Sequence, residues 1–108
     1  MKIIIGDTLQ GFASEKIPGG KLLKVRVNYN DIITNVKIMG DFFMHPENAI
    51  EVIEAVLINT KKDESELTIQ QKIEKTIEAI NAKLIGVTPE AIARVLKQAM
   101  KWSGDWLN

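Results

Sequence analysis

The 108-residue chain has no cysteine and a single histidine, and each of these scarcities excludes a class of chemistry. Without cysteine there is no disulfide framework, no thiol nucleophile and no cysteine-ligated zinc or iron–sulfur centre. With His45 as the one histidine, two-histidine metal sites are excluded as well. We therefore expect no catalytic, cofactor-binding or metal-binding residues in this chain, and a reducing, cytoplasmic compartment.

The sequence also lacks an excess of charge of either sign and any long apolar run. Lys+Arg and Asp+Glu both number 14, so the formal net charge is zero. Neither nucleic acid nor an anionic membrane surface is therefore an expected partner. The run Ile3-Ile4-Ile5 is too short for a signal segment or a membrane span.

What the chain does contain is an ordinary globular composition, with 45% hydrophobic and 26% charged residues. Its length predicts one domain, residues 1–108.

The first part of the chain has the period-two pattern of strands. From Leu22 to Tyr29 one face is apolar, and a second strand is expected from Ile32 to Met39. A weaker strand, Leu9–Ile17, leads into the turn Pro18-Gly19-Gly20, and residues 1–8 could add an edge strand. The expected inward-facing residues are Leu23, Val25, Val27 and Tyr29 in one strand, and Ile32, Thr34, Val36 and Ile38 in the next.

The remainder has the signals of three helices. Pro46 is expected at the first position of one helix, and the capping-box pattern Thr68-x-x-Gln71 at the start of the second. The second helix has an apolar stripe that ends before Gly86. The third opens with Thr88-Pro89-Glu90. The expected apolar faces comprise Ile50, Ile53, Val56 and Leu57; Ile69, Ile73, Ile77, Ile80 and Leu84; and Ile92, Val95, Leu96, Ala99 and Met100.

Strands followed by helices predict an α+β fold: a small antiparallel meander of three to four strands, followed by three helices packed on one face.

Few residues point to chemistry. Gly19-Gly20-Lys21 lacks the spacing of a Walker loop and is interpreted as a turn. In Gly40-Asp41-Phe42-Phe43 two interpretations stay open: Asp41 bonds loop amides while a phenylalanine fills the core, or the loop docks a partner. Trp102 is expected in the core, and Trp106 in the core or at an interface.

One family resemblance goes further. The accessory, C-terminal-type domain of lipoate–protein ligases has a Gly-Lys strand, a hairpin, a second strand ending in Gly-Asp-Phe-Phe, and a helix after a proline. The corresponding residues here are Ile17–Val27, Ile32, Val36, Ile38, Gly40-Asp41-Phe42-Phe43, Pro46 and Glu47. The chain resembles this domain over roughly Ile17 to Leu96.

The resemblance implies a separate, non-catalytic accessory subunit of a bipartite ligase. Such ligases use ATP to activate lipoate to lipoyl-adenylate and then transfer the lipoyl group to a carrier-protein lysine. The implied partner is the catalytic subunit, in a heterodimer, with lipoyl carrier domains as indirect partners. ATP, magnesium and lipoate are expected in the catalytic partner, and whether this chain is itself counted an enzyme is left open.

The candidate partner-docking residues are Gly20, Lys21, Gly40, Asp41, Phe42 and Phe43. For Lys21 the alternative is contact with a phosphate.

A rival interpretation is a small interaction adaptor of similar fold without a role in lipoylation. The sheet-then-helices plan also resembles sulfur-acceptor and iron–sulfur scaffold proteins, whose activity zero cysteine disfavours.

Overall fold

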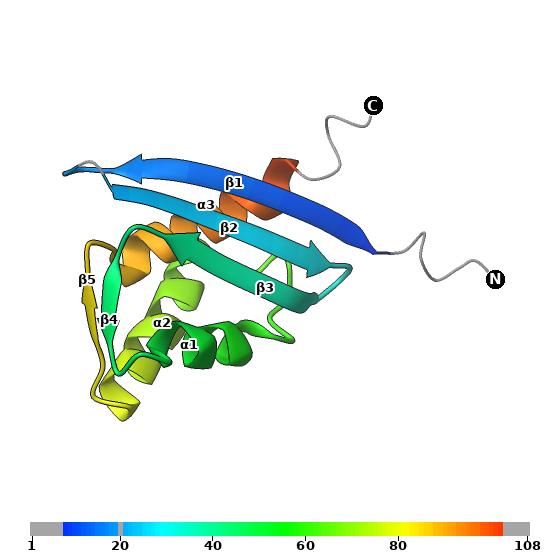
Figure 1. Ribbon diagram of the computed structural model, residues 1–108. Coiled ribbons are helices and arrows are strands. Elements are labelled where there is room, and N and C mark those ends of the chain that lie inside the picture. The colour runs from blue at the N-terminus through cyan, green and yellow to red at the C-terminus, as the bar shows by residue number, and fades with distance from the viewer. Residues whose placement is uncertain (1–7, 20, 103–108) are drawn as a thin grey trace.

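A three-stranded antiparallel sheet forms one layer of the molecule. The computed structural model describes residues 8–19 and 21–102, and within them β1 (Leu9–Ile17), β2 (Lys21–Tyr29) and β3 (Ile33–Gly40) follow one another as a meander in the order β1-β2-β3 (Figure 1). The α+β class and the meander are confirmed. The edge strand expected through Ile3-Ile4-Ile5 lies outside the described residues.

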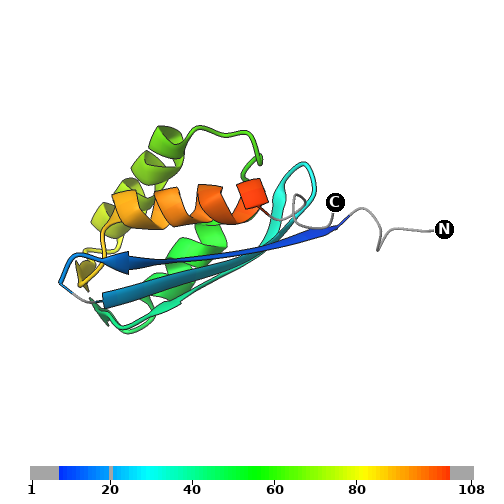
Figure 2. The same cartoon turned by 90° about the horizontal axis from the view of Figure 1, so that it is seen from above.

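Three helices and a small hairpin complete the fold: β4 (Phe43–His45), α1 (Ala49–Leu57), α2 (Glu66–Ala79), β5 (Lys83–Ile85) and α3 (Pro89–Trp102). Helix α3 runs along the sheet against β1 and β2, as Figure 2 shows from above, and α1 packs against β3. Helix α2 packs mainly on α1 and α3, so it forms an outer layer rather than lying on the sheet as expected. No helix in the described part of the chain is long and apolar enough to cross a membrane.

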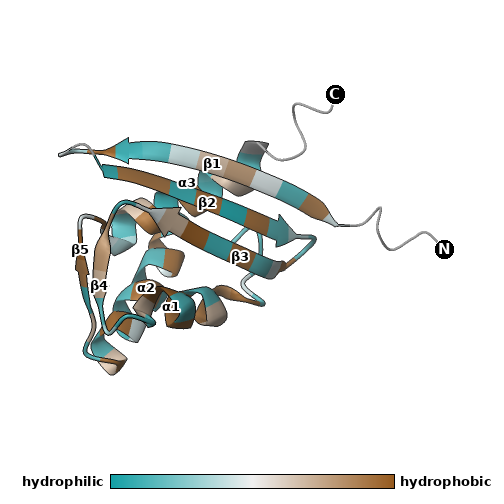
Figure 3. Cartoon of the chain, in the orientation of Figure 1, coloured by the Kyte–Doolittle hydropathy of each residue, from teal (hydrophilic) through white to brown (hydrophobic). Residues whose placement is uncertain are grey.

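The core is built on the central strand. Leu23, Val25 and Val27 are fully buried and Tyr29 nearly so, whereas the alternate residues of β2 are exposed or half-buried. The alternating bands on β2 in Figure 3 are these two faces. The predicted inner face of this strand is thus confirmed.

Two side-chain contacts fix α3 on the sheet. The Tyr29 hydroxyl donates a buried hydrogen bond to the Met100 carbonyl oxygen at 2.6 Å. The Arg94 guanidinium makes a forked ion pair with Glu15 of β1, with Nε–Oε1 at 3.0 Å and Nη2–Oε2 at 2.5 Å. The second turn of α3 and its C-terminal part are therefore each tied to one of the strands that the helix covers.

The outer edge of β3 is covered by polar contacts from the first helix and the segment after it. The Ile38 amide donates to Glu54 Oε2 at 2.7 Å. The Ile33 amide donates to the Thr60 carbonyl, and the Asn59 amide donates to the Ile33 carbonyl, both at 2.8 Å. Such cover satisfies backbone groups that an edge strand otherwise leaves open.

The predicted inner face of β3 was wrong at its first residues. The register shifts between Asn28 and Tyr29, so that Tyr29 pairs with Ile33 rather than with Thr34. The irregularity turns Ile33 into the core at 0% exposure and leaves Thr34 outside, where its hydroxyl donates to the Asn28 carbonyl. Val36 and Ile38 keep the predicted side because the pairing is regular beyond the irregularity.

The first two helix starts also differ from expectation. Pro46 precedes α1, which begins at Ala49, because the Pro46 carbonyl closes a turn by accepting from the Ala49 amide. Helix α2 begins at Glu66, since the Ser65 hydroxyl accepts from the Thr68 amide at 3.1 Å. Thr68 thus lies within the first turn and does not cap it.

The end of the second apolar stripe is a strand. Helix α2 stops at Ala79, and Asn81 adopts a positive φ of 54°. Leu84 therefore lies in β5, which pairs with β4, a hairpin that the sequence did not predict. The start of the third helix is confirmed: Thr88 Oγ1 accepts from the Ala91 amide, and Pro89 is its first residue.

Gly40 ends β3 at a close approach. A Cβ on this residue would lie well inside contact distance of the Leu22 carbonyl oxygen and 2.7 Å from Phe42 Cε2. Since Leu22 belongs to β2, the central strand of the sheet, its backbone cannot move away without disturbing the pairing of β2 and β3.

Gly40→Ala should therefore lower the free energy of unfolding by about 2–3 kcal/mol, through overpacking against backbone. For a domain of this size the melting temperature should fall by roughly 10–15 °C. Thermal and urea denaturation followed by circular dichroism would measure both. Ser14→Ala, at an exposed strand position, is the control and should leave both values nearly unchanged. An unchanged melting temperature for Gly40→Ala would contradict the described approach.

The Glu15–Arg94 pair predicts a pH dependence. The hydrogen bonds from Arg94 lower the pKa of Glu15, more than partial burial raises it. The pair therefore stabilises the fold above the unfolded-state pKa of about 4.3, and this contribution is lost as the pH falls through the lower folded-state pKa. Because both side chains are partly exposed, it is worth about 0.5 kcal/mol.

Glu15→Gln should be less stable than the natural chain by this amount at pH 7, and the difference should shrink as the pH falls below the unfolded-state pKa of about 4.3. Denaturation curves across this range would measure it, with the exposed Glu47→Gln as control. A constant difference at all pH values would show that the loss comes from packing alone.

Candidate partner-docking site

The docking residues predicted from the sequence gather at one end of the molecule. Lys21 begins β2, Gly40 ends β3, and Asp41 and Phe42 connect β3 to β4, which begins at Phe43. The Asp41 amide donates to the Leu22 carbonyl at 3.1 Å, which holds this connection against the start of β2. Gly20, the remaining candidate, lies outside the described residues.

The β4–β5 hairpin sets the direction of its side chains. Phe43 pairs with Ile85, Met44 with Leu84, and His45 with Lys83. Met44 and Leu84 are half-buried and pack against the core, so the alternation of a strand turns Phe43 and Ile85 outward.

The resulting Phe43–Ile85 pair is an exposed apolar feature, with 68% of Phe43 and 62% of Ile85 accessible to solvent. Directly opposed side chains of this kind contact one another on the hairpin surface. An exposed aromatic beside an exposed aliphatic residue is typical of an anchor at a protein interface.

Lys21 lies beside this pair. Its Nζ is 5.9 Å from the centroid of the Phe43 ring, within the range of a cation–π contact. Gly86, with a positive φ of 96°, follows Ile85, and a Cβ there would lie 3.3 Å from Phe42 Cβ and 3.5 Å from Lys21 Cγ. The segments around Lys21, Phe42 and Gly86 therefore pack closely together.

The two phenylalanines have different environments. Phe42 is half-buried and packs against the core, while Phe43 is exposed. Asp41 is exposed, and among the described residues its carboxylate accepts no hydrogen bond. The expectation that this carboxylate bonds loop amides is thus wrong; the loop is held by the Asp41 amide and by Phe42.

Ile85 is the member of this site that sequence reasoning missed. Lys83-Leu84-Ile85 was interpreted as the end of a helix, because Leu84 continues the spacing of the Ile69–Ile80 stripe. A strand of three residues shows too little alternation to be recognised.

The site brings together an exposed apolar pair and a cation. Among the described residues there is no group of three or more His, Asp or Glu side chains that could hold a metal ion. His45 is exposed on β4 and pairs through its backbone with Lys83. An apolar pair with an adjacent cation can anchor another protein surface.

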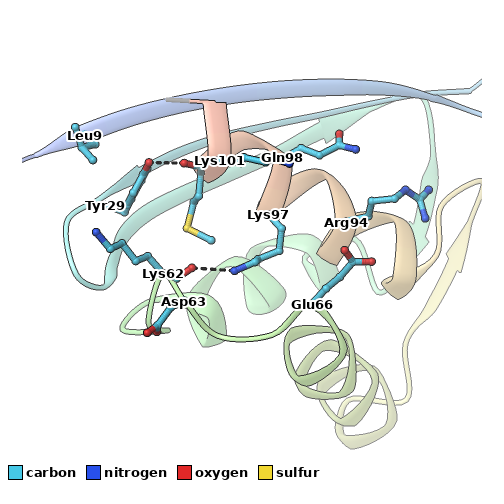
Figure 4. A pocket seen from close by; sticks show the side chains of 10 residues that line it. Leu9, Tyr29, Lys62, Asp63, Glu66, Arg94, Lys97, Gln98 and Lys101 are labelled. Atoms are coloured by element: carbon cyan, nitrogen blue, oxygen red, sulfur yellow. Dashed lines mark hydrogen bonds between the residues drawn. The ribbon is translucent and has the colours of Figure 1, made fainter. Parts of the chain in front are cut away.

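A separate cavity of about 740 Å³ lies at the other end of the sheet, between α3 and the segment that joins α1 to α2 (Figure 4). The Lys97 ammonium donates to the Lys62 carbonyl at 2.9 Å across it. Its walls combine both signs of charge and several apolar groups: Leu9, Tyr29, Lys62, Asp63, Glu66, Arg94, Lys97, Gln98, Met100 and Lys101. This mixture selects no particular class of ligand.

Comparison with solved structures shows a likeness of fold. A chain from the structure of an archaeal lipoylation system, a bi-partite lipoate protein ligase and its E2 lipoyl domain from Thermoplasma acidophilum, is 24% identical in sequence. The match has a TM-score of 0.68 and covers 82% of this chain and 96% of that chain. No curated protein sequence matches.

Comparison with family models identifies the family. The model described as the C-terminus of bacterial lipoate protein ligase matches residues 12–96. This range runs from β1 into α3 and includes every described residue of the docking site. The resemblance noted in the sequence is thereby confirmed, and the chain belongs to the family of bacterial lipoate protein ligase C-terminal domains.

Proposed function

We propose that this chain is a non-catalytic accessory subunit of a bipartite lipoate–protein ligase, required when the catalytic subunit activates lipoate to lipoyl-adenylate with ATP. The lipoyl group then passes to a lysine of a carrier protein. The observation that carries this proposal is the family match over residues 12–96, most of the chain.

The solved chain that this chain resembles belongs to a bi-partite ligase. The match extends over 96% of that solved chain, which supports an arrangement in which the accessory part is a separate chain. In this proposal the two subunits form a heterodimer in the cytoplasm. The resemblance in fold to iron–sulfur scaffold proteins stays a prediction, and the absence of cysteine disfavours iron–sulfur chemistry.

ATP, magnesium and lipoate are held by the catalytic subunit in this proposal. Activation brings the lipoate carboxylate against the α-phosphate of ATP, and the two anions must be held together while water is excluded. The accessory subunit promotes this step by binding the closed, competent arrangement of its partner better than the open one. It contributes contacts and no reacting group.

The Phe43–Ile85 pair and Lys21 supply the main anchor for that contact. Aromatic residues are frequent among interface positions that dominate binding energy. Phe43 is 68% exposed, so its ring contributes little to the core of the free chain, and Ile85 and Lys21 lie beside it. Gly40, Asp41 and Phe42 hold the anchor in position through their contacts with Leu22 and the core.

Activation should require both subunits. We expect the cognate catalytic subunit, given lipoate, ATP and magnesium, to form lipoyl-adenylate rapidly only when this chain is added. With preformed lipoyl-adenylate and a carrier domain, transfer should proceed without it. Chromatography of the adenylate and mass spectrometry of the carrier domain would measure the two steps.

If this chain neither binds the catalytic subunit nor changes either step, the proposal is wrong and the adaptor without a lipoate role becomes the better interpretation. Dependence of transfer alone on this chain would assign it to the second step instead.

Phe43→Ala should weaken binding to the catalytic subunit about tenfold, since an aromatic anchor is lost. Leu67→Ala is the matched control, because Leu67 is 59% exposed but lies on α2, away from the hairpin. Isothermal titration calorimetry would give both affinities, and both variants should melt at the temperature of the natural chain. Equal affinities for the two variants would remove Phe43 from the interface.

A further inference from the structure

The outer face of the sheet carries charge of one sign. The residues of β1, β2 and β3 that alternate with the core residues are exposed or half-buried, and those that are charged are all cations: Lys16, Lys24, Arg26 and Lys37. The other outward residues are Gln10, Phe12, Ser14, Leu22, Asn28, Thr34, Asn35 and Met39. No acidic side chain lies on this basic face among the described residues.

Strand pairing brings these cations together. Arg26 of β2 lies directly opposite Lys37 of β3, and Lys24 is two residues from Arg26 on the same face. Lys16 of β1 is diagonal to Lys24, because Ser14 pairs with Lys24 and Lys16 with Leu22. Like charges directly opposite one another destabilise a sheet. The arrangement is therefore unfavourable for the free chain.

Nothing in the described part of the chain neutralises these charges. The ion pair in that part joins Arg94 and Glu15 on the inner side of the sheet, and no hydrogen bond involves the basic-face cations. Asp31 and Asp41, the acidic residues nearest in sequence to β3, lie in the segments before and after it. Since the whole chain is neutral, the molecule has a positive sheet side and an excess of acid elsewhere.

We propose that the basic face is the electrostatic docking surface for an acidic surface of the catalytic ligase subunit. This inference rests on the proposed function and adds the chemistry of the partner surface. A flat face of exposed cations attracts a carboxylate-rich surface and raises the rate of encounter. Phe12, 52% exposed on the same face beside Arg26, gives the contact an apolar element.

The basic face adjoins the proposed anchor. Leu22, at the end of this face, pairs with Lys16, and its carbonyl accepts from the Asp41 amide. One partner surface can therefore cover the cations and the Phe43–Ile85 pair together. In this arrangement the cations govern how fast the subunits associate, and the apolar pair governs how long they stay together.

A protein surface fits these observations better than a nucleic acid. A sheet that binds single strands usually stacks bases on two or three aromatic side chains, and this face has Phe12 alone among the described residues. The acidic remainder of a neutral chain also opposes the approach of a long polyanion.

A comparison of two variants, each with two cationic residues replaced by glutamine, tests this inference. Arg26→Gln/Lys37→Gln removes the opposed cations, and Lys61→Gln/Lys75→Gln makes the same charge change at exposed residues outside the sheet. Stopped-flow or surface-plasmon measurements with the purified catalytic subunit would give association and dissociation rates at low and high salt. The first variant should melt at or above the temperature of the natural chain, because a repulsion is relieved.

We expect Arg26→Gln/Lys37→Gln to associate at least about fivefold more slowly than the natural chain at low salt, with a weaker salt dependence and a similar dissociation rate. Lys61→Gln/Lys75→Gln should associate within about twofold of the natural chain.

Equal rates and salt dependence for both variants, with the natural chain still binding and promoting adenylation, would overturn the inference and leave the proposed function intact. Failure of the natural chain to bind the catalytic subunit would instead remove the proposed function, and the inference with it. Tighter binding of a single-stranded RNA oligonucleotide than of the catalytic subunit, with the loss confined to the first variant, would also overturn the inference.

Discussion

The burial of one face of β2 is the constraint on which the rest of the structure depends. This strand lies between β1 and β3 and turns Leu23, Val25, Val27 and Tyr29 into the core. Its apolar face needs cover, which α3 provides with help from α1 on the β3 side. The Tyr29–Met100 hydrogen bond and the Glu15–Arg94 ion pair then fix the position of α3. Within residues 8–19 and 21–102, the helices cover this face and leave the outward side chains of the other face exposed or half-buried.

The same strand also positions the candidate docking site. Leu22 holds the segment after β3 through its carbonyl oxygen, and the close approach at Gly40 brings Phe42 against the core. With Phe42 fixed, the next residue begins β4, and pairing with β5 turns Phe43 and Ile85 outward. Ile85, far along the chain, thus joins the candidate site through the hairpin, and the exposed Phe43–Ile85 pair lies on a well-supported hairpin.

Much of the fold could be predicted from local pattern, because alternation and helix capping act over a few residues. The strand Leu9–Ile17, the inner face of β2 and the start of α3 at Pro89 were all correctly predicted. Two of the errors arose where distant contacts decide. Ile33 faces the core because of an irregular pairing with β2, and Leu84 lies in β5 because it pairs with β4. The start of α2 is a local error instead, because Ser65 caps this helix and the predicted cap, Thr68, lies three residues later. Of the candidate site, the motif around Gly40–Phe43 could be found in the sequence, whereas Ile85 required the three-dimensional pairing.

In the language of folding landscapes, the opposed Arg26 and Lys37 are a point of local frustration, where a choice made on the surface conflicts with the stability of the strands that carry it. Folded chains retain such conflicts chiefly where function requires them. In the proposed arrangement, carboxylates of the partner surface would resolve this conflict, whereas the free chain keeps it and is less stable than its backbone allows. Replacing one of these cations to raise the thermal stability of the chain should therefore succeed, and on the proposal made above it would also slow assembly with the partner.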